Sequence, residues 1–479
     1  MKRFTGIQTQ ALAAAVLSLF FACAGTPATE SGNGDPTPAP GKVIFAAPDA
    51  KTSGDGSIER PCTVHQAVEK AAKGWTIGGE YTLVKRLELN ARGTEAEPIR
   101  MLAYNREKPV FECSGLTEAV WSRQGIVLRE GCYWYLQGIE VTGAYNEGFR
   151  IVNGSHNTFD RCVAHHNGGS GFSMSFGHEK PGEPLPNPDG EKAAWNTFVN
   201  CDSYNNFDWW TVNGGVPAAG TNADGFAVKQ GSGRGNRFIG CRAWNNSDDA
   251  WDLYECGHAV EMTDCWAWHT GHREDHVDMY ADRTGGSLTE EVWAGDGNGF
   301  KMGGGCLDIS GRECRAYSKG THLLRNCISF DNAKKGFDQN NHPMGAWIEN
   351  CLSFGNGINF QFWKENTEGT GWVLRNNISM NGARKDQFKG LTLLADDHNS
   401  WNLGIKGKPA DFVSLSAADA AAPRGADGSL PEHFGRLAAG SAFIDRGAPT
   451  ETVRGDGFAR EPIPYNGSAP DLGAYEYNQ

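Results

Sequence analysis

The sequence predicts an all-β fold in which one chain winds through successive coils of a parallel β-solenoid. One phrase recurs along the chain, in copies such as "GNRFIGCRAWNN" and "HLLRNCISFDN", and neighbouring copies lie as little as 24 positions apart, as Cys241 and Cys265 do. The copies are short β-type runs that end in Asn or Gly, which fits the strands and turns of one coil. Leucine-rich repeats have a similar length, but their regular leucine framework is absent from this sequence.

The composition indicates a turn-rich protein with a net negative charge. The chain has 479 residues, 63 of them Gly and 15 Trp, and a formal net charge of −13. A nucleic-acid scaffold is disfavoured, because affinity for phosphates comes from basic residues. An acidic polysaccharide would need a metal ion or a local basic cleft to supply positive charge.

The first 42 residues predict export and a flexible tether. Residues 1–22 have a basic start, an apolar run and small residues at the end, which is typical of a signal peptide. The stretch "LFFAC" fits either a lipoprotein site, with a lipid on Cys23, or an ordinary signal-peptidase site. Residues 23–42 have the composition of a tether. We therefore expect a secreted or cell-surface protein whose solenoid domain spans residues 43–479, with membrane contact only through a lipid on Cys23.

Both ends of the solenoid are expected to be covered. The stretch "TVHQAVEKAAK" predicts a short amphipathic helix that covers the N-terminal end. The repeat is lost after about Asp397, and residues 397–479 are expected to pack back as an irregular C-terminal cap. Such caps matter because exposed strand edges invite aggregation.

Equivalent positions of successive coils are expected to stack. The recurring cysteines predict a buried ladder of thiols rather than disulfides: Cys162, Cys201, Cys241, Cys265, Cys327 and Cys351, with Asn377 in the next copy. The Asn residues that end the phrase are expected to bond one another's side chains and the turn backbone. Cys306 and Cys314 lie outside the ladder and could close a local disulfide loop.

The second half of each copy carries an aromatic residue that is expected to point into the core. This column is Phe172, Phe226, Trp251, Phe300, Phe337 and Phe360. By strand alternation the next residue points outward; these residues are Ser173, Ala227, Asp252, Lys301, Asp338 and Gln361. The residues two positions before the aromatic are Ser170, Asp224, Asp249, Asn298, Lys335 and Ile358. Since neighbouring coils lie about 4.8 Å apart, one outer patch gathers Asp224, Asp248, Asp249 and Asp252, with Lys301 on the next coil.

Four carboxylates on rigid strands favour a calcium site. Neighbouring carboxylates repel each other unless a cation, a shared proton or full solvation relieves the charge. Calcium prefers about six to eight hard oxygen ligands. A solvated acidic face or Asp turn chemistry is the alternative interpretation, and it accounts poorly for four aligned aspartates.

Lys301, in "GNGFKMGG", is predicted to project beside this patch, between glycines that leave room for a ligand. A poorly hydrated lysine beside bound calcium would have its neutral form favoured, as a general base requires. This pairing suits β-elimination of a galacturonate: calcium on the C6 carboxylate acidifies the C5 proton, Lys301 removes it and the C4 oxygen departs. Activity is then expected to rise toward alkaline pH.

The chain resembles family 9 polysaccharide lyases, which include pectate lyases, from about Val43 to its end. The resemblance rests on "NADGFAVK", "SDDAWDLYE", "GNGFKMGG", "KGFDQNN" and "PDLGAYE" in their order and spacing. It implies a single-stranded right-handed parallel β-helix that binds calcium and uses Lys301 as the Brønsted base. It places the calcium ligands at Asp224, Asp248, Asp249 and Asp252, and a substrate contact at Lys229.

The implied partner is an acidic plant cell-wall polysaccharide, of the homogalacturonan or rhamnogalacturonan type. We take Lys335 and Asp338, in "KGFDQNN", as further candidate substrate contacts. We expect the chain to act as a monomer.

The segment between Asp252 and Lys301 looks longer than usual for that family and is expected to form a loop beside the substrate cleft. Within it, residues 271–283 contain His272 and His276, four positions apart and flanked by acidic residues. This spacing predicts either a zinc or second calcium site, or a charged exposed loop. Four aromatic residues are interpreted as either sugar-stacking or core residues: Trp209, Trp210, Trp266 and Trp268.

Two other functions fit parts of the pattern. An inverting polygalacturonase would use paired aspartates as acid and base, but its Gly-His-Gly and Arg-x-Lys elements are missing from the matching places, and Lys301 would have no role. A calcium-stiffened adhesin or polysaccharide-binding solenoid would use the aspartates for stability alone. Formation of an unsaturated product from polygalacturonate distinguishes the lyase from both.

Overall fold

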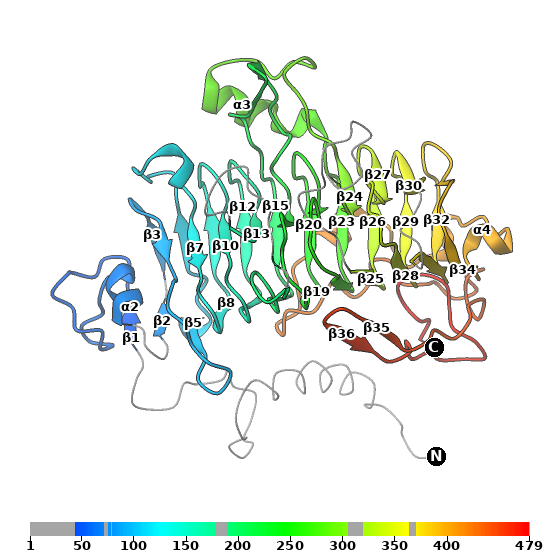
Figure 1. Ribbon diagram of the computed structural model, residues 1–479, viewed down its shortest axis with the longest axis horizontal. Helices are drawn as coiled ribbons and strands as arrows, with labels where there is room; N and C mark the ends of the chain where they lie inside the picture. Colours follow the sequence, from blue (N-terminus) through cyan, green and yellow to red (C-terminus); the bar gives the residue numbers. More distant parts are fainter. Residues whose placement is uncertain are drawn as a thin grey trace.

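The computed structural model is a parallel β-helix whose coils stack along the long axis of the molecule (Figure 1). It describes residues 44–70, 75–77, 79–177, 187, 189–304, 320–363 and 370–478. Through most of the stack each coil contributes one strand to each of three parallel sheets, which confirms the solenoid expected from the repeat. The predicted signal peptide and tether, Cys23, and the Cys306–Cys314 pair lie outside the described residues.

The three long sheets differ in their place on the coil. The twelve-stranded sheet contains, in spatial order, β1 Ile44–Ala46, β2 Trp75–Ile77, β5 Ile99–Ala103, β8 Trp134–Gln137, β11 Thr158–Asp160, β14 Thr197–Val199, β19 Asn236–Ile239, β22 Val260–Thr263, β25 His322–Arg325, β28 Ala346–Glu349, β31 Trp372–Arg375 and β34 Leu393–Asp397. The site sheet contains β4 Leu87–Glu88, β7 Ile126–Arg129, β10 Phe149–Val152, β13 Phe172–Ser175, β18 Phe226–Lys229, β21 Trp251–Asp252, β24 Asn298–Lys301, β27 Lys335–Asp338, β30 Ile358–Phe362 and β33 Gln387–Phe388. The third sheet contains β3 Glu80–Thr82, β6 Val110–Glu112, β9 Glu140–Thr142, β12 Val163–His165, β15 Asp202–Tyr204, β20 Arg242–Trp244, β23 Trp266–Trp268, β26 Ile328–Phe330, β29 Leu352–Phe354 and β32 Ile378–Met380.

Short helices and two small antiparallel ribbons decorate the stack. The helices are α2 Val64–Lys70, η1 Tyr104–Arg106, η2 Val120–Ser122, η3 Arg273–His276, α3 Val277–Thr284, α4 Ser400–Leu403, η4 Pro409–Asp411 and α5 Ala417–Ala420. The ribbons are β16 Val212–Asn213 with β17 Val216–Pro217, and β35 Val453–Gly455 with β36 Phe458–Arg460. Within the described part of the chain, every helix falls short of the length and apolar character that a membrane crossing requires.

The aromatic column predicted from the repeat runs through the core of the stack. Phe226 pairs in register with Trp251, and Trp251 with Phe300. Their rings stack with centroids 4.8 Å and 4.9 Å apart. Each such aromatic pair adds about 0.5–1.5 kcal/mol beyond the burial of its area. The column therefore holds the register of the site sheet.

The cysteine and asparagine ladders are also confirmed. The six ladder cysteines are fully buried, and every described cysteine is a free thiol. The Cys241 thiol donates to the Phe198 carbonyl oxygen of the previous coil at 3.4 Å. In the turns, Asn167 Nδ2 donates to Asn206 Oδ1 at 3.0 Å, and Asn206 Nδ2 donates to Asn246 Oδ1 at 2.8 Å. These bonds satisfy polar turn groups that the stack buries.

Both ends of the stack are covered. Helix α2 packs against β1 through the buried side chains of Val64 and Ala67. At the other end, the Trp401 ring on α4 lies 5.3 Å from that of Phe360. The chain after α4 then packs back along the third sheet, and its β35–β36 ribbon lies beneath the stack in Figure 1.

The returning chain covers apolar side chains on the outer face of the third sheet. The Trp266 and Phe434 rings lie 4.9 Å apart, and Trp266 Nε1 donates to the Tyr475 hydroxyl at 3.1 Å. Further back, the Arg424 guanidinium pairs with Asp202 at 2.7 Å. Trp266 is consequently fully buried.

Candidate functional site

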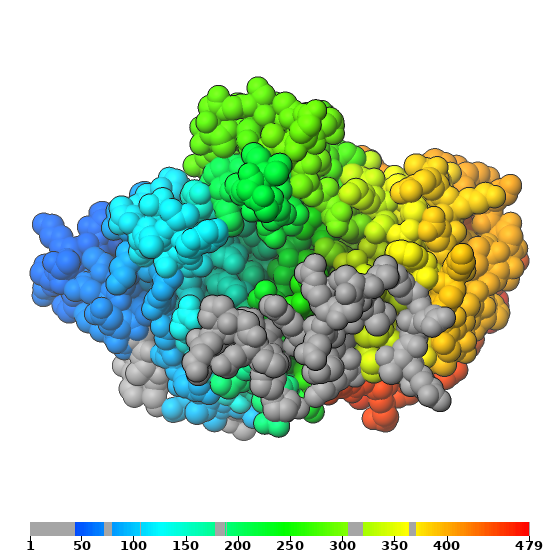
Figure 2. Space-filling model, turned by 45° about the horizontal axis from the view of Figure 1, so that its top comes forward, coloured from blue at the N-terminus to red at the C-terminus, as the bar shows by residue number. Residues whose placement is uncertain are grey.

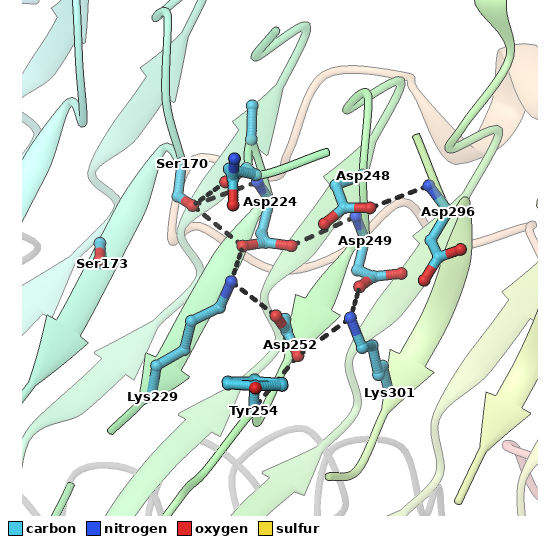
Figure 3. A network of polar contacts seen from close by, with 12 residues as sticks. Ser170, Ser173, Asp224, Lys229, Asp248, Asp249, Asp252, Tyr254, Asp296 and Lys301 are labelled. Carbon is cyan, nitrogen blue, oxygen red and sulfur yellow. Dashed lines mark hydrogen bonds and ion pairs between the residues drawn. The ribbon is translucent and has the colours of Figure 1, made fainter. Parts of the chain in front are cut away.

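Three aspartates from neighbouring coils converge on the outer face of the site sheet. Asp224 precedes β18, Asp249 precedes β21, and Asp252 ends β21. One oxygen from each carboxylate lies within 4.8 Å of those from the other two. The three side chains point toward one another in Figure 3. The inward pairing of Phe226 with Trp251 holds the strands in the register that places the aspartates together.

Hydrogen bonds across the coils orient these carboxylates. Ser170 Oγ donates to Asp224 Oδ2 at 3.0 Å, and the Asp249 amide donates to Asp224 Oδ1 at 3.3 Å. Asn298 donates to Asp249 Oδ1 from its amide at 3.0 Å and from Nδ2 at 2.7 Å. These hydrogen bonds link the equivalent positions of successive coils that the repeat predicts: Ser170, Asp224, Asp249 and Asn298. Carboxylates held in this way lose little further rotamer freedom when a ligand binds.

Asp248 lies beside this group and faces a different neighbour. Its Oδ1 accepts a hydrogen bond from the Asp296 amide at 2.9 Å (Figure 3). Among the described residues, the convergent group is formed by Asp224, Asp249 and Asp252 without Asp248. The sequence correctly placed all four aspartates in one patch, but only three share a centre.

Two lysines lie within hydrogen-bonding distance of the convergent aspartates. Lys229 Nζ lies 2.8 Å from Asp224 Oδ2 and 2.6 Å from Asp252 Oδ2. Lys301 Nζ lies 2.8 Å from Asp249 Oδ2 and 3.5 Å from Asp252 Oδ1. Lys229 ends β18 and Lys301 ends β24, on either side of β21. Asp252 therefore lies between two ammonium groups (Figure 3).

The aspartates and Lys301 are buried, although their side chains project from the outer face, and Lys229 is partly buried. The four aspartates are 0–4% exposed and Lys301 is 8% exposed. Burial raises the pKa of Asp249 to about 7, although the Lys301 charge opposes the shift. Burial and the charge of Asp249 raise the pKa of Asp248 well above its usual range. The lysines therefore compensate the carboxylates incompletely.

The same charges act on the lysines. Burial by itself would lower the pKa of Lys301, but the charges of Asp249 and Asp252 raise it well above its usual value. The pKa of Lys229 is raised in the same way by Asp224 and Asp252. Bare carboxylates thus favour the protonated lysine, whereas the neutral form was expected from the sequence for a lysine beside bound calcium. The neutral form requires a cation that takes over the carboxylates' charge.

The group fits a divalent cation with oxygen ligands. The four buried aspartates outnumber the two lysines beside them, and the raised pKa values of Asp248 and Asp249 show that the group lacks positive charge. Carboxylate oxygens within 4.8 Å of one another can contact one calcium ion at about 2.3–2.6 Å. The donors are hard oxygens, which suit calcium better than a soft transition metal.

The two further residues taken as substrate contacts lie one coil beyond Lys301. Asp338 pairs in register with Lys301 across β24 and β27. Lys335 Nζ lies 2.9 Å from Asp338 Oδ2, so the two residues form an ion pair with each other. The structure therefore places them next to the site along the stack axis.

The insertion, defined here as residues 271–297, does not form the loop expected from the sequence. It contains η3 Arg273–His276 and α3 Val277–Thr284, and it forms the green projection at the top of Figures 1 and 2. Helix formation allows Val277 and Tyr280 to pack against the apolar cluster around Phe207. The prediction missed this helix because its apolar residues are few.

His276 is part of this packing. It is 1% exposed, and its ring stacks on Phe207 and Trp293 with centroids 4.9 Å and 5.6 Å away. Burial lowers the pKa of His276 to about 3. Of the two alternatives considered for this segment, a metal site that uses His276 is therefore excluded.

Most of the tryptophans considered for sugar stacking are buried within the protein. Trp266 and Trp268 are 0% and 2% exposed, under the returning chain, and Trp209 is 9% exposed. Trp210 Nε1 donates to the Gly168 carbonyl oxygen at 2.7 Å. Trp209, Trp266 and Trp268 are therefore core residues, whereas Trp210 is partly buried.

Tyr254 is a site residue that the sequence reasoning missed. Its side chain lies beside Asp252 and is 38% exposed (Figure 3), and its amide donates to Asp252 Oδ1 at 3.0 Å. A Cβ at Gly304 would lie only 2.5 Å from the Tyr254 ring, so glycine gives the ring its place. Strand alternation was the available signal, because Tyr254 stands two positions after the outward-pointing Asp252.

Known proteins resemble the chain over most of its length. The family described as "Pel9A-like, right handed beta helix region" matches residues 44–377. Pectate lyase L of Dickeya chrysanthemi is 33% identical over 91% of this chain and 91% of its own. Pectate lyase L of Paenibacillus polymyxa (strain SC2) is 32% identical over 89% of this chain and 88% of its own.

Two solved structures share the fold. The crystal structure of pectate lyase Pel9A superposes with a TM-score of 0.71 at 32% identity, and covers 91% of this chain and 96% of its own. A rhamnogalacturonan lyase superposes with a TM-score of 0.65 at 25% identity, and covers 83% of this chain and 97% of its own.

Proposed function

The chain belongs to the Pel9A-like right-handed β-helix family, and on this premise we propose that it is a pectate lyase-like polysaccharide lyase. Its substrate is a galacturonate-containing pectic polysaccharide, which it cleaves by β-elimination. The observation that carries the proposal is the contact of Lys301 with Asp249 and Asp252 inside a buried acidic group. The acidic group and a basic side chain thereby lie on one face of the site sheet.

The proposed cofactor is calcium. Asp224, Asp249 and Asp252 would hold it, with Asp248 beside them as the fourth acidic residue. Bound calcium would neutralise the substrate carboxylate and make its C5 proton more acidic. The shortage of positive charge beside the buried carboxylates supports a divalent ion.

Lys301 is the proposed Brønsted base. Its Nζ would accept the C5 proton while the C4–oxygen bond breaks and a C4–C5 double bond forms. The side chain is anchored at the end of β24, in register with Asp252 on β21. This anchoring limits the positions of Nζ, which is the contribution expected of a rigid scaffold.

Other side chains on the same face suit an acidic sugar polymer. Two further lysines lie along the same face, Lys229 two coils before Lys301 and Lys335 one coil after it, with Asp338 beside Lys335. Tyr254 offers a partly exposed ring on which a sugar could pack. Because the chain resembles both a pectate lyase and a rhamnogalacturonan lyase, we propose a pectic acid backbone of either type as the substrate.

The contacts of the aspartates disfavour the hydrolase alternative. An inverting glycosidase needs its two carboxyl groups about 6.5–9.5 Å apart to admit a water. Here the oxygens of the three convergent carboxylates lie within 4.8 Å of one another. Lys229 and Lys301 form ion pairs with these carboxylates.

We also propose that the protein acts outside the cytoplasm, as a secreted or cell-surface enzyme. The leader-like residues 1–22 and the "LFFAC" stretch at Cys23 support this location. A pectic substrate of plant cell walls is consistent with it.

The test uses the purified chain with polygalacturonate and with rhamnogalacturonan, in the presence of calcium or of a chelator. We expect ultraviolet absorbance of an unsaturated product with calcium and its loss after chelation. Reducing ends without this absorbance would show a hydrolase. Binding without cleavage of either polymer would overturn the lyase proposal.

A further inference from the structure

Two histidines and two aspartates gather at the base of the insertion, away from the site sheet. His269 follows β23 and Asp331 follows β26, at equivalent turn positions of neighbouring coils. His269 Nδ1 lies 2.7 Å from Asp331 Oδ2, and His269 Nε2 lies 2.9 Å from Asp275 Oδ2. The His272 ring stacks on that of His269, with centroids 4.4 Å apart.

The hydrogen bonds of His272 leave one ring nitrogen for a ligand. His272 Nε2 lies 2.9 Å from the Asp331 carbonyl oxygen. A carbonyl oxygen only accepts, so Nε2 carries the proton and the lone pair of neutral His272 is on Nδ1. A backbone carbonyl that holds the second nitrogen in this way is the usual support of a metal-binding histidine.

We propose that His269, His272 and Asp331 bind a transition-metal ion, with zinc as the expected species. One donor atom from each of the three residues lies within 4.8 Å of the other two. Two imidazoles with a carboxylate are a zinc-type donor set, whereas the acidic group on the site sheet offers oxygens alone. Asp275 contacts His269 Nε2, the nitrogen opposite the one beside Asp331, so its role would be to orient the ring of that ligand.

The metal would tie the start of the insertion to the body of the stack. Asp331 belongs to the next coil, while His272 and Asp275 belong to the insertion. The far end of the insertion returns to the acidic group, where the Asp296 amide donates to Asp248. Bound zinc is therefore expected to stabilise the insertion. The proposal stands independently of the lyase function.

The test is a titration of the chelator-treated full chain with Zn²⁺ by isothermal calorimetry, repeated with Co²⁺ to follow its visible d–d bands. We expect one zinc ion per chain and Co²⁺ bands typical of nitrogen ligation. Separate His269→Ala, His272→Ala and Asp331→Asn variants should each weaken zinc binding at least about tenfold. Limited proteolysis within the insertion should slow when zinc is added to the wild type only.

Two controls locate the ion. His398→Ala removes a histidine that also pairs with an aspartate, Asp397 at 3.1 Å, outside this group, and it should leave zinc binding unchanged. Asp249→Asn alters the acidic group and should also leave it unchanged. Circular dichroism of each variant shows whether it is folded.

Three results would overturn the proposal. The wild type could bind no zinc, a folded His272→Ala variant could bind it as tightly as the wild type, or Asp249→Asn could abolish binding. Calcium-dependent cleavage tests the proposed lyase function, and zinc binding tests the site at His269, His272 and Asp331. Failure of one proposal can therefore be distinguished from failure of the other.

Discussion

Lys301 Nζ lies 2.8 Å from Asp249 Oδ2, although 52 positions separate the two residues in the chain. The contact exists because β21 and β24 are adjacent strands of the site sheet, with Trp251 opposite Phe300 in the core. The insertion between them leaves the stack without changing this register. Most of the predictions below depend on side chains held in this way.

Replacing Lys301 by Ala is expected to lower kcat on polygalacturonate by about 10²–10⁴-fold, the usual contribution of a general base. Calcium binding should persist, because the aspartates remain. Ultraviolet absorbance of the unsaturated product measures the rate. Lys334→Ala is the matched control. Lys334 is an exposed lysine on the coil after that of Lys301, and it pairs with Asp296. Full activity in Lys301→Ala would exclude this residue as the base.

The rate of the wild type is expected to rise toward alkaline pH. A lysine accepts a proton only when it is neutral, and the surrounding aspartates raise the pKa of Lys301. The measurement is kcat against pH at saturating calcium. A maximum below neutrality would contradict the assignment of a lysine base.

Replacing Asp249 by Asn is expected to weaken calcium binding and abolish cleavage. Asp249 accepts bonds from Asn298 and Lys301 and belongs to the convergent group. Isothermal calorimetry with Ca²⁺ measures the affinity. Asp278→Asn, on the exposed face of α3, should bind calcium like the wild type. If the two variants bound calcium with equal affinity, the assignment of the calcium site to this group would be wrong.

Replacing Tyr254 by Ala is expected to raise KM more than it lowers kcat. The partly exposed ring offers packing area to a sugar and lies outside the acidic group. Tyr254→Phe keeps the ring and should retain most of the affinity. Initial rates across polymer concentrations separate the two constants. If both variants showed the same KM as the wild type, sugar packing on this ring would be wrong.

Acid is expected to destabilise the fold through His322. Burial lowers the pKa of His322 from 6.5 to about 4; its Nδ1 accepts the Val260 amide at 3.0 Å. His322 is therefore protonated near pH 6.5 in the unfolded chain but only near pH 4 in the folded protein. As the pH is lowered from 6.5 to 4, the free energy of unfolding should therefore decrease by about 1.4 kcal/mol per pH unit. Above pH 6.5 His322 should not affect it.

Denaturant unfolding of the wild type and of His322→Gln at several pH values checks this expectation. The glutamine variant lacks the titration, so its deficit in unfolding free energy should shrink between pH 6.5 and pH 4. A deficit that stays constant with pH would show that His322 does not titrate in this way.

Replacing Asn206 by Ala is expected to cost about 1–3 kcal/mol of unfolding free energy for each buried partner left unpaired. Asn206 bonds Asn167 on one coil and Asn246 on the other. Asn213→Ala changes an exposed residue of the β16–β17 ribbon and should stay within about 0.5 kcal/mol of the wild type. Equal unfolding midpoints would contradict the role of the ladder.

The repeat determined the fold and most of the site's positions. In a parallel stack, equivalent residues of successive coils must lie one strand spacing apart. Aligning the copies therefore places Asp224 beside Asp249, and Asp252 beside Lys301, from the sequence alone. The cysteine and aromatic ladders followed from the same periodicity.

Only the tertiary structure decided what breaks that periodicity. The helix of the insertion, the burial of His276 and the covering of Trp266 by the returning chain depend on segments that have no equivalent in other coils. The separation of Asp248 from the convergent group depends on the Asp296 amide. The meeting of His269, His272 and Asp331 needs a turn and an insertion to approach each other. Periodicity fixes neighbours within the stack, whereas side-chain direction and aperiodic segments are settled by packing in three dimensions.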